Sequence, residues 1–261
     1  MADPVYRPVI AFAKIVFEAL GIRFHITGAE NVPVKGGAVM AINHIGYLDF
    51  TFAGFATRPR GRLVRFMAKS EVFQHKVSGP LMRGMKHIPV DRSAGAGSYR
   101  LAVQACREGE IVGVFPEATI SQSFDLKEFK TGAARMAMEA GVPLLPTVIW
   151  GSQRIMTKGR KRDLTRGTDL RIVLGELYWP EPGSKPVQVT RELKERMQAL
   201  LDEARATYRG APRTPEDTWW VPASQGGTAP TLADAESADL QERAARAARH
   251  AARTDDSSPG K

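Results

Sequence analysis

The residues best suited to chemistry are a histidine and an aspartate in the segment 43–49 (Asn-His-Ile-Gly-Tyr-Leu-Asp), which directly follows an apolar run at 38–42. On a continuous helix, Asp49 would lie about 140° around the axis from His44, so the side chains meet only if the chain turns between them. Gly46 offers backbone freedom for that turn. Once in contact, the carboxylate would fix the imidazole tautomer and stabilise the imidazolium formed when a hydroxyl proton is taken. The spacing indicates a general base with its orienting acid; a structural hydrogen bond is the ordinary alternative.

The segments around this pair alternate in a way that predicts the fold. Apolar runs indicate buried strands, and stretches with helical spacing lie between them. This alternation favours a single α/β domain with a largely parallel, covered sheet flanked by helices. In such sheets, ligands bind beyond the carboxyl ends of the strands, where the segment 43–49 should lie. The expected strands are 38–42, 63–68, 87–90, 111–115, 144–149 and 170–174, and the expected helices are 49–56, 98–107, 131–140 and 187–208.

The two ends of the chain differ from this central pattern. An apolar stretch at 9–22 contains a lysine and a glutamate four residues apart, which can pair on one helix face. It is shorter than the roughly 20 apolar residues that span a bilayer, and we expect no signal peptide. We expect an N-terminal helix in 1–24 that either packs on its own domain or lies in a membrane interface. Residues 211–261 predict a low-complexity, disordered tail with at most a short Ala/Arg helix.

The composition narrows the possible chemistry. A net charge of +9 and a pI of 9.8 suit nucleic acid, an anionic membrane surface or phosphorylated substrates, and do not choose among them. Cys106 is the only cysteine, which excludes a disulfide framework and a cysteine-rich zinc site. A serine hydrolase would need a Gly-x-Ser-x-Gly elbow, which is absent. Complete phosphate-loop, dinucleotide-binding and nucleic-acid-binding motifs are absent as well.

Four short blocks in the region 43–146 form a recognisable order. They are the His-x4-Asp segment at 43–49, the Gly-to-Arg turn at 84–92, Phe-Pro-Glu-Ala-Thr-Ile-Ser at 115–121, and Val-Pro-Leu-Leu-Pro at 142–146. On these blocks the sequence resembles the glycerolipid acyltransferase family, and within it the 1-acylglycerol-3-phosphate acyltransferases. Ala-Lys-Ser-Glu at 68–71 and Phe-Lys-Thr-Gly at 129–132 also look like elements of the family. One block would be weak evidence, whereas four in the family order are a specific pattern.

The resemblance implies a role for several residues. His44 would be the general base on the acceptor hydroxyl, and Asp49 would orient it and balance its charge. Lys69 and Arg92 would hold the acceptor phosphate, because fixed cations suit phosphate oxygens. Glu117 would shape the acceptor pocket. The supporting positions would be Asn43, Gly84 and Thr119, with Thr119 among the substrate-binding residues.

The third block departs from the family pattern at two positions. Ala118 and Ile120 stand where the family typically has Gly and Arg. An isoleucine cannot contact a phosphate by charge, so the usual phosphate clamp is incomplete. The acceptor implied by the resemblance is 1-acylglycerol-3-phosphate, while another lysophospholipid or a glycolipid head group stays open. The nearby cations that could replace the arginine are Lys127, Lys130, Arg135 and Arg154.

The resemblance implies an O-acyltransferase of phospholipid biosynthesis that uses acyl-CoA or acyl carrier protein as donor and a lysophospholipid as acceptor, with no cofactor and no metal. From 58 to 92 the chain holds nine Lys and Arg against two acidic residues. This run is either a solvated face or a membrane-facing patch, since each cation near anionic lipid contributes on the order of 1 kcal/mol. We expect a cytoplasmic enzyme, peripheral on the inner face of the cell membrane, with no nucleic-acid partner. A basic, non-enzymatic membrane or nucleic-acid binder is the alternative.

Overall fold

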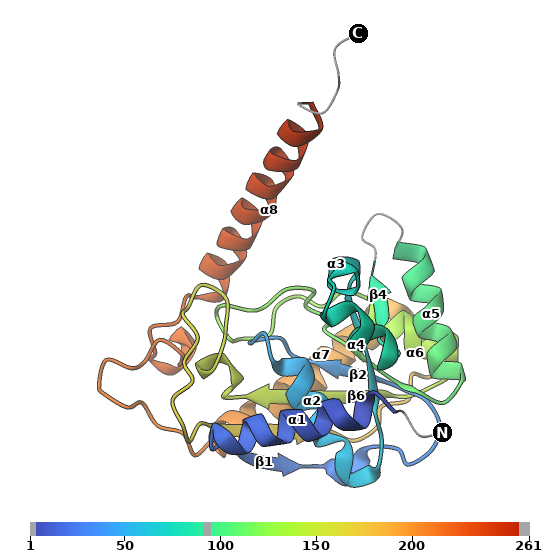
Figure 1. Ribbon diagram of the computed structural model, residues 1–261, viewed down its shortest axis with the longest axis horizontal. Helices are drawn as coiled ribbons and strands as arrows, with labels where there is room; N and C mark the ends of the chain where they lie inside the picture. Colours follow the sequence, from blue (N-terminus) through green and yellow to red (C-terminus); the bar gives the residue numbers. More distant parts are fainter. Residues whose placement is uncertain (1–3, 91–94, 256–261) are drawn as a thin grey trace. The chain divides into compact units, whose positions relative to one another are not determined.

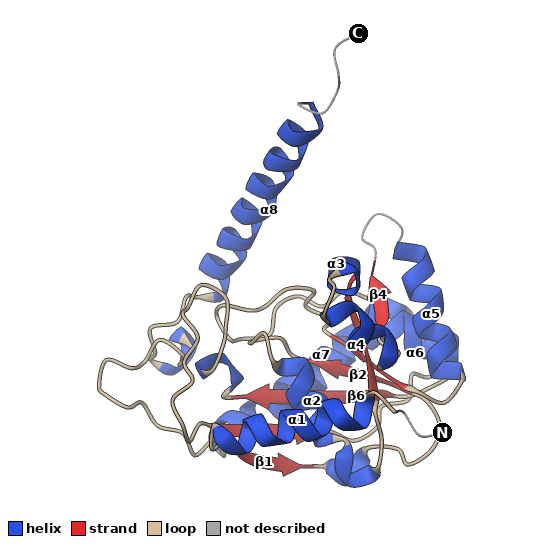
Figure 2. Ribbon diagram, in the orientation of Figure 1, coloured by secondary structure: helices blue, strands red, loops and turns tan. Residues whose placement is uncertain are grey.

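The computed structural model describes residues 4–90 and 95–255, and a seven-stranded sheet lies at its centre (Figures 1 and 2). The strands are β1 (Arg23–Thr27), β2 (Ala38–Ile42), β3 (Val64–Lys69), β4 (Ile88–Val90), β5 (Ile111–Val114), β6 (Leu144–Trp150) and β7 (Asp169–Leu174). Their order in the sheet is β1-β7-β6-β2-β5-β3-β4. The run from β6 to β4 is parallel, and β1 and β7 form a parallel pair that runs the opposite way, because β6 and β7 pair antiparallel.

Helices cover both faces of this sheet. α1 and α2 lie on one face, whereas α7 packs against β6 and β7 on the other (Figure 1). The helices are α1 (Tyr6–Ala19), α2 (Asp49–Ala56), α3 (Ser70–Gln74), α4 (Ser78–Gly84), α5 (Gly95–Arg107), α6 (Gly132–Ala140), α7 (Pro186–Ala206) and α8 (Leu232–Asp255). Four short 3-10 helices are η1 (Ala29–Asn31), η2 (Arg58–Arg60), η3 (Ser152–Arg154) and η4 (Ala223–Gln225).

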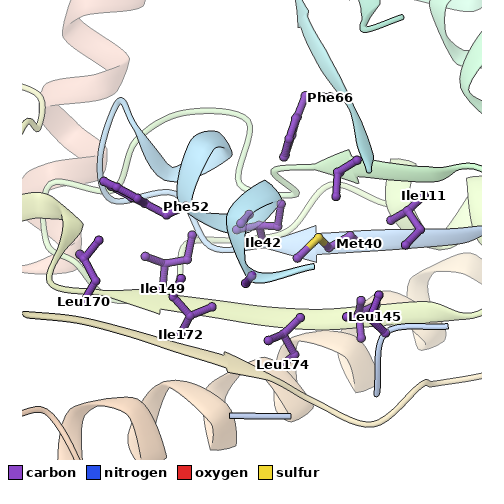
Figure 3. Packing of buried hydrophobic residues seen from close by; sticks show 14 of the residues in the cluster. Met40, Ile42, Phe52, Phe66, Ile111, Leu145, Ile149, Leu170, Ile172 and Leu174 are labelled. Carbon is purple, nitrogen blue, oxygen red and sulfur yellow. The ribbon is translucent and has the colours of Figure 1, made fainter. Parts of the chain in front are cut away.

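The core explains why the central strands are mainly apolar. Every residue of β2, β6 and β7 is buried, as expected for strands covered on both faces. One cluster joins Met40 and Ile42 of β2, Leu145 and Ile149 of β6, and Phe52 of α2 (Figure 3). Burying each such side chain contributes about 1.5–3 kcal/mol. The result is a rigid platform from which the loops at the carboxyl ends of β2, β5 and β3 leave on one edge.

The α/β architecture and the six expected strands are confirmed, with bounds that differ by at most one residue. β1 was not expected, because it is a half-buried edge strand with Arg23 and His25 among its five residues. The short helices α3 and α4 were not expected either, since they hold too few turns for a hydrophobic period to emerge.

Helix α1 has one face that packs on the domain and another that exposes apolar side chains. It packs on the sheet through Phe17 and Tyr6, whose hydroxyl donates to Val64 O at 2.7 Å. Its outer face leaves Phe12 68% and Ile15 63% exposed. Among the residues described, no helix has the length and apolar character needed to cross a bilayer. Attachment of 1–24 to a membrane surface therefore stays a prediction.

Residues 121–127 and 212–261 form a second compact unit. Within it, the buried Lys127 ammonium pairs with the Asp239 carboxylate, and the Phe124 ring meets the edge of Trp219 at 6.3 Å between centroids. The Ala/Arg helix that the tail sequence allowed is present as α8. The partition of the chain at 24 and 210 and the disorder of 211–261 stay predictions.

Candidate active site

Asn43 determines how the loop leaves β2. Its side chain is fully buried and bridges to β6, donating from Nδ2 to Ile149 O at 3.0 Å and accepting from Ile149 N at 2.7 Å. The amide thus continues the β2–β6 ladder by one step through a side chain instead of the backbone. The next residue, His44, is therefore presented at the carboxyl edge of the sheet in a defined direction.

The loop that follows wraps around one carboxylate oxygen. Oδ2 of Asp49 lies 3.0 Å from His44 Nδ1 and accepts the backbone N–H groups of Ile45 and Gly46, each at 2.8 Å. Helix α2 begins at Asp49, so this residue joins the loop to the helix. The turn expected between His44 and Asp49 is therefore present in the structure, and the two side chains meet.

Gly46 is needed for a different reason from the one expected. It is not among the described residues with a positive φ, so the turn does not depend on a left-handed glycine. Instead, a Cβ at this position would lie 3.1 Å from Met156 O and 3.2 Å from both Ser152 O and Asp49 Oδ1. The glycine allows the segment after β6 to approach the loop closely.

The surroundings of the pair stabilise a carboxylate beside the imidazole. Asp49 is completely buried and surrounded by hydrogen-bond donors, which stabilise a carboxylate. The contact with Asp49 favours the His44 tautomer with its proton on Nδ1, which leaves a lone pair on Nε2. The imidazole, 19% exposed, stacks on the Phe115 ring at 4.1 Å between centroids and 23° between planes. A ring held in this way can take a proton from a hydroxyl at Nε2.

The third block reaches the same loop through Glu117. This carboxylate is buried, and its Oε1 accepts the His44 backbone N–H at 2.8 Å. Ala118 follows with φ of 64°, in the left-handed region that favours glycine, and its N–H donates to Phe115 O. The alanine thus occupies the conformation for which the family's glycine is suited. Glu117 supports the His44 backbone; its expected role in shaping an acceptor pocket stays a prediction.

The expected phosphate ligands are distributed unevenly. Lys69 is exposed and is the last residue of β3. Only β5 lies between β3 and β2 in the sheet, and the three strands are parallel. Lys69 and His44 therefore both lie at the carboxyl edge of the sheet. Thr119 lies half-buried in the loop after β5. Arg92 lies outside the described residues. Ile120 is buried, as suits its apolar side chain.

The four cations that could replace the missing arginine are not equivalent. Arg154 is buried and hydrogen-bonds Tyr208, and Arg135 lies over the Tyr99 ring at 5.4 Å. Lys127 pairs with Asp239 in the second unit. Lys130 is exposed, and its backbone N–H donates to Pro116 O at 2.9 Å, within the third block. Lys130 is thus exposed and joined through its backbone to the third block.

Sequence reasoning missed the contacts between the segment 151–157 and the loop 43–49. Ser152 Oγ donates to Asp49 Oδ1 at 2.6 Å, Thr157 Oγ1 donates to Ile45 O at 2.7 Å, and Tyr47 N donates to Met156 O at 2.9 Å. A serine directly after a buried strand and a glycine was the signal that could have indicated this contact. Within the described part of the chain, no group of His, Cys, Asp and Glu residues could hold a metal ion.

Comparison with known proteins shows the family to which the chain belongs. The Acyltransferase family profile matches residues 23–150. The chain is 32% identical over 149 residues to the 1-acyl-sn-glycerol-3-phosphate acyltransferase of Bacillus subtilis, an alignment that covers 56% of this chain and 69% of that protein. Its match to the enzyme of the same name from Borreliella burgdorferi is 31% identical and covers 57% and 59% of the two chains. The match to the chloroplastic enzyme LPAT1 of Arabidopsis thaliana is 26% identical and covers 77% and 56%. The chain thus spans somewhat more than half the length of the last two relatives.

A solved structure supports the fold. The crystal structure of the 1-acyl-sn-glycerophosphate (LPA) acyltransferase PlsC from Thermotoga maritima superposes with a TM-score of 0.65 at 24% identity, covering 78% of this chain and 81% of that one. At this identity the likeness concerns the fold. The family assignment rests on the sequence matches and agrees with the order of the four blocks. From these matches we conclude that the chain is an enzyme and belongs to the acyltransferase family.

Proposed function

We propose that this acyltransferase moves a fatty acyl group from acyl-CoA or acyl carrier protein to the hydroxyl of a lysophospholipid, with 1-acylglycerol-3-phosphate as the preferred acceptor. The observation that carries the proposal is the 3.0 Å contact between His44 Nδ1 and Asp49 Oδ2 at the carboxyl edge of the sheet. The names of the relatives from Bacillus subtilis and Borreliella burgdorferi supply the substrate class.

The proposed transfer is direct and needs no acyl-enzyme intermediate. His44 Nε2 takes the hydroxyl proton while the acceptor oxygen bonds to the thioester carbonyl carbon. Asp49 stabilises the imidazolium so formed, because the two groups are 3.0 Å apart and the carboxylate is buried. Collapse of the tetrahedral intermediate breaks the C–S bond, and the thiolate leaves with the proton from His44. The histidine returns to its starting state after each cycle.

An apolar cavity of about 70 Å³ between α1, α2 and β3 supports a substrate with a fatty acyl chain. Its walls include Phe50 and Thr51, which directly follow Asp49 in α2, together with Phe17 of α1 and Phe66 of β3. We propose that the cavity receives the acyl chain of the donor and that its depth determines the preferred chain length.

The acceptor phosphate is proposed to bind Lys69 and Arg92, with Lys130 in the place of the cation that Ile120 cannot supply. Lys69 and Lys130 are both exposed, and both lie on segments that leave the carboxyl edge of the sheet. Fixed cations at two or three points suit a phosphate monoester better than a neutral glycolipid head group. A second lysophospholipid or a glycolipid acceptor is the alternative within the same reaction.

Docking on an anionic membrane, at the inner face of the cell membrane, is proposed from exposed side chains of α1, of α4 and of the segment between α3 and α4. Phe12 and Ile15 of α1 and Leu81 of α4 are exposed, as is Val77 between α3 and α4. Arg58, Lys76 and Lys86, which belong to the basic run that begins at residue 58, are exposed as well. Flotation with anionic vesicles, lost at high salt and absent with neutral vesicles, is the expected result.

The decisive experiment measures acyl transfer from labelled acyl-CoA to a panel of lysolipids. His44→Ala should abolish transfer while the circular dichroism spectrum and unfolding midpoint remain those of the wild type. His25→Ala is a matched control, because His25 also contacts a carboxylate, Asp169, at 2.9 Å but lies outside the proposed site. Turnover by His44→Ala within tenfold of the wild type would defeat the mechanism. Equal rates with phosphate-bearing and phosphate-free acceptors would defeat the proposed acceptor.

A further inference from the structure

The two oxygens of the Asp49 carboxylate have different partners. Oδ2 accepts from His44 Nδ1 and from the amides of Ile45 and Gly46, all from the same loop. Oδ1 accepts from Ser152 Oγ at 2.6 Å, a residue 103 positions away in sequence. Ser152 is 1% exposed and Asp49 is completely buried. Ser152 is therefore the long-range partner that distinguishes one carboxylate oxygen from the other.

A hydrogen-bonded turn holds Ser152 in place for its contact with Asp49. Ser152 begins η3, directly after β6 and Gly151, whose φ is 98°. A Cβ on Gly151 would lie 2.3 Å from Asp169 O, so the chain must turn here with a glycine. The Gln153 side chain accepts the Gly151 N–H at 2.9 Å, and the backbone N–H of Ile155 closes the turn on Ser152 O at 3.0 Å. The hydroxyl thus approaches Asp49 from a rigid turn.

We propose that Ser152 is a positioning residue of the acyl transfer, whose hydroxyl holds the Asp49 carboxylate with Oδ2 directed at His44 Nδ1. The inference rests on the proposed function and adds a residue to its machinery. Without the hydroxyl, Oδ1 would lose its donor in a buried place, and a buried carboxylate without a donor favours its protonated form. Rotation of the carboxylate would also be less restricted, which weakens the alignment with the imidazole.

Thr157 provides a matched comparison. It comes from the same segment, is 2% exposed, and its hydroxyl donates to Ile45 O at 2.7 Å in the same loop. It therefore joins the same two segments as Ser152 but does not touch the carboxylate. Thr157→Val removes one buried hydrogen bond between these two segments, as Ser152→Ala does. If Ser152 contributed only to the stability of the fold, the two variants would have the same effect.

The test compares Ser152→Ala, Ser152→Thr and Thr157→Val in the full chain with labelled acyl-CoA and 1-acylglycerol-3-phosphate. Ser152→Ala should lower kcat roughly 10–100-fold with little change in KM. It should also move the acidic limb of the pH profile of kcat upward by about 0.5–1 pH unit, because a carboxylate that has lost one donor stabilises the neighbouring imidazolium more strongly. Ser152→Thr should restore both quantities, and Thr157→Val should leave the acidic limb in place.

The proposal is overturned if Ser152→Ala keeps the wild-type kcat and acidic limb, if Thr157→Val moves the limb as far, or if Ser152→Thr behaves like Ser152→Ala. A second readout separates this inference from the proposed function. The ¹⁵N chemical shifts of the His44 ring, assigned with His44→Ala, report its tautomer and titration without any substrate. If the wild type transfers no acyl group but the ring signals shift in Ser152→Ala alone, the function fails and the positioning role stands.

Discussion

Asp49 serves the fold and the chemistry at once, and two substitutions separate these roles. Asp49→Ala removes the acceptor from the buried amides of Ile45 and Gly46, as well as from Ser152 and His44. Each unpaired buried donor costs about 1–3 kcal/mol, so the two amides alone account for roughly 2–6 kcal/mol. Asp49→Asn keeps a carbonyl oxygen at the position of Oδ2, and the Ser152 hydroxyl can turn to accept from the new amide. It should cost only about 1 kcal/mol.

We therefore expect Asp49→Ala to be less stable than Asp49→Asn by about 2 kcal/mol or more. Both variants lose the negative charge that balances the imidazolium, and turnover should fall about a thousandfold or more in each. Urea unfolding followed by tryptophan fluorescence measures the first quantity, and acyl transfer from acyl-CoA measures the second. Equal urea midpoints and slopes for the two variants would refute the loop-clamping role. An Asp49→Asn enzyme with near-normal turnover would refute the electrostatic one.

Three further predictions concern the surroundings of the site. Ala118→Gly should raise the free energy of unfolding by about 0.5–1 kcal/mol, because Ala118 has φ of 64°; an unchanged or lower urea midpoint would argue against strain there. The hydrogen bond from Arg23 lowers the pKa of Asp169 from 3.8 to about 2 against the opposing effect of burial, with His25 assisting. Since the folded pKa lies below the unfolded one, this stabilisation is present above about pH 4 and is lost as pH falls toward 2. Asp169→Asn should thus cost about 1–2 kcal/mol at pH 7, allowing for the half-exposed Arg23, and almost nothing near pH 2; a difference independent of pH would contradict this. Gly54→Leu should shift the acyl-CoA preference toward shorter chains, because a Cβ there would lie 3.5 Å from the Phe66 ring at the cavity wall; an unchanged chain-length profile would separate the cavity from donor binding.

Much of the fold could be predicted because its signal is local. The mainly apolar runs that became β2, β6 and β7 are buried along their whole length, and the alternation with helices indicated a mainly parallel sheet. The reversed direction of β7 and β1 could not be predicted, since a buried strand has the same apolar pattern in either direction. β1 escaped prediction because an edge strand buries only part of its surface.

The site shows the same division. The sequence by itself determined that His44 and Asp49 flank a possible turn after a buried strand, and the order of the four blocks identified the family. Only the tertiary structure decided that the Glu117 carboxylate accepts the His44 backbone N–H and that Arg154 hydrogen-bonds Tyr208. It also decided that the Ser152 hydroxyl donates to the second oxygen of Asp49. These contacts join positions 73 and 103 residues apart in the case of Glu117 and Ser152. Spacing along the chain specifies a neighbour within one loop or one helix. A partner on another strand depends on strand order and register, which the whole core sets.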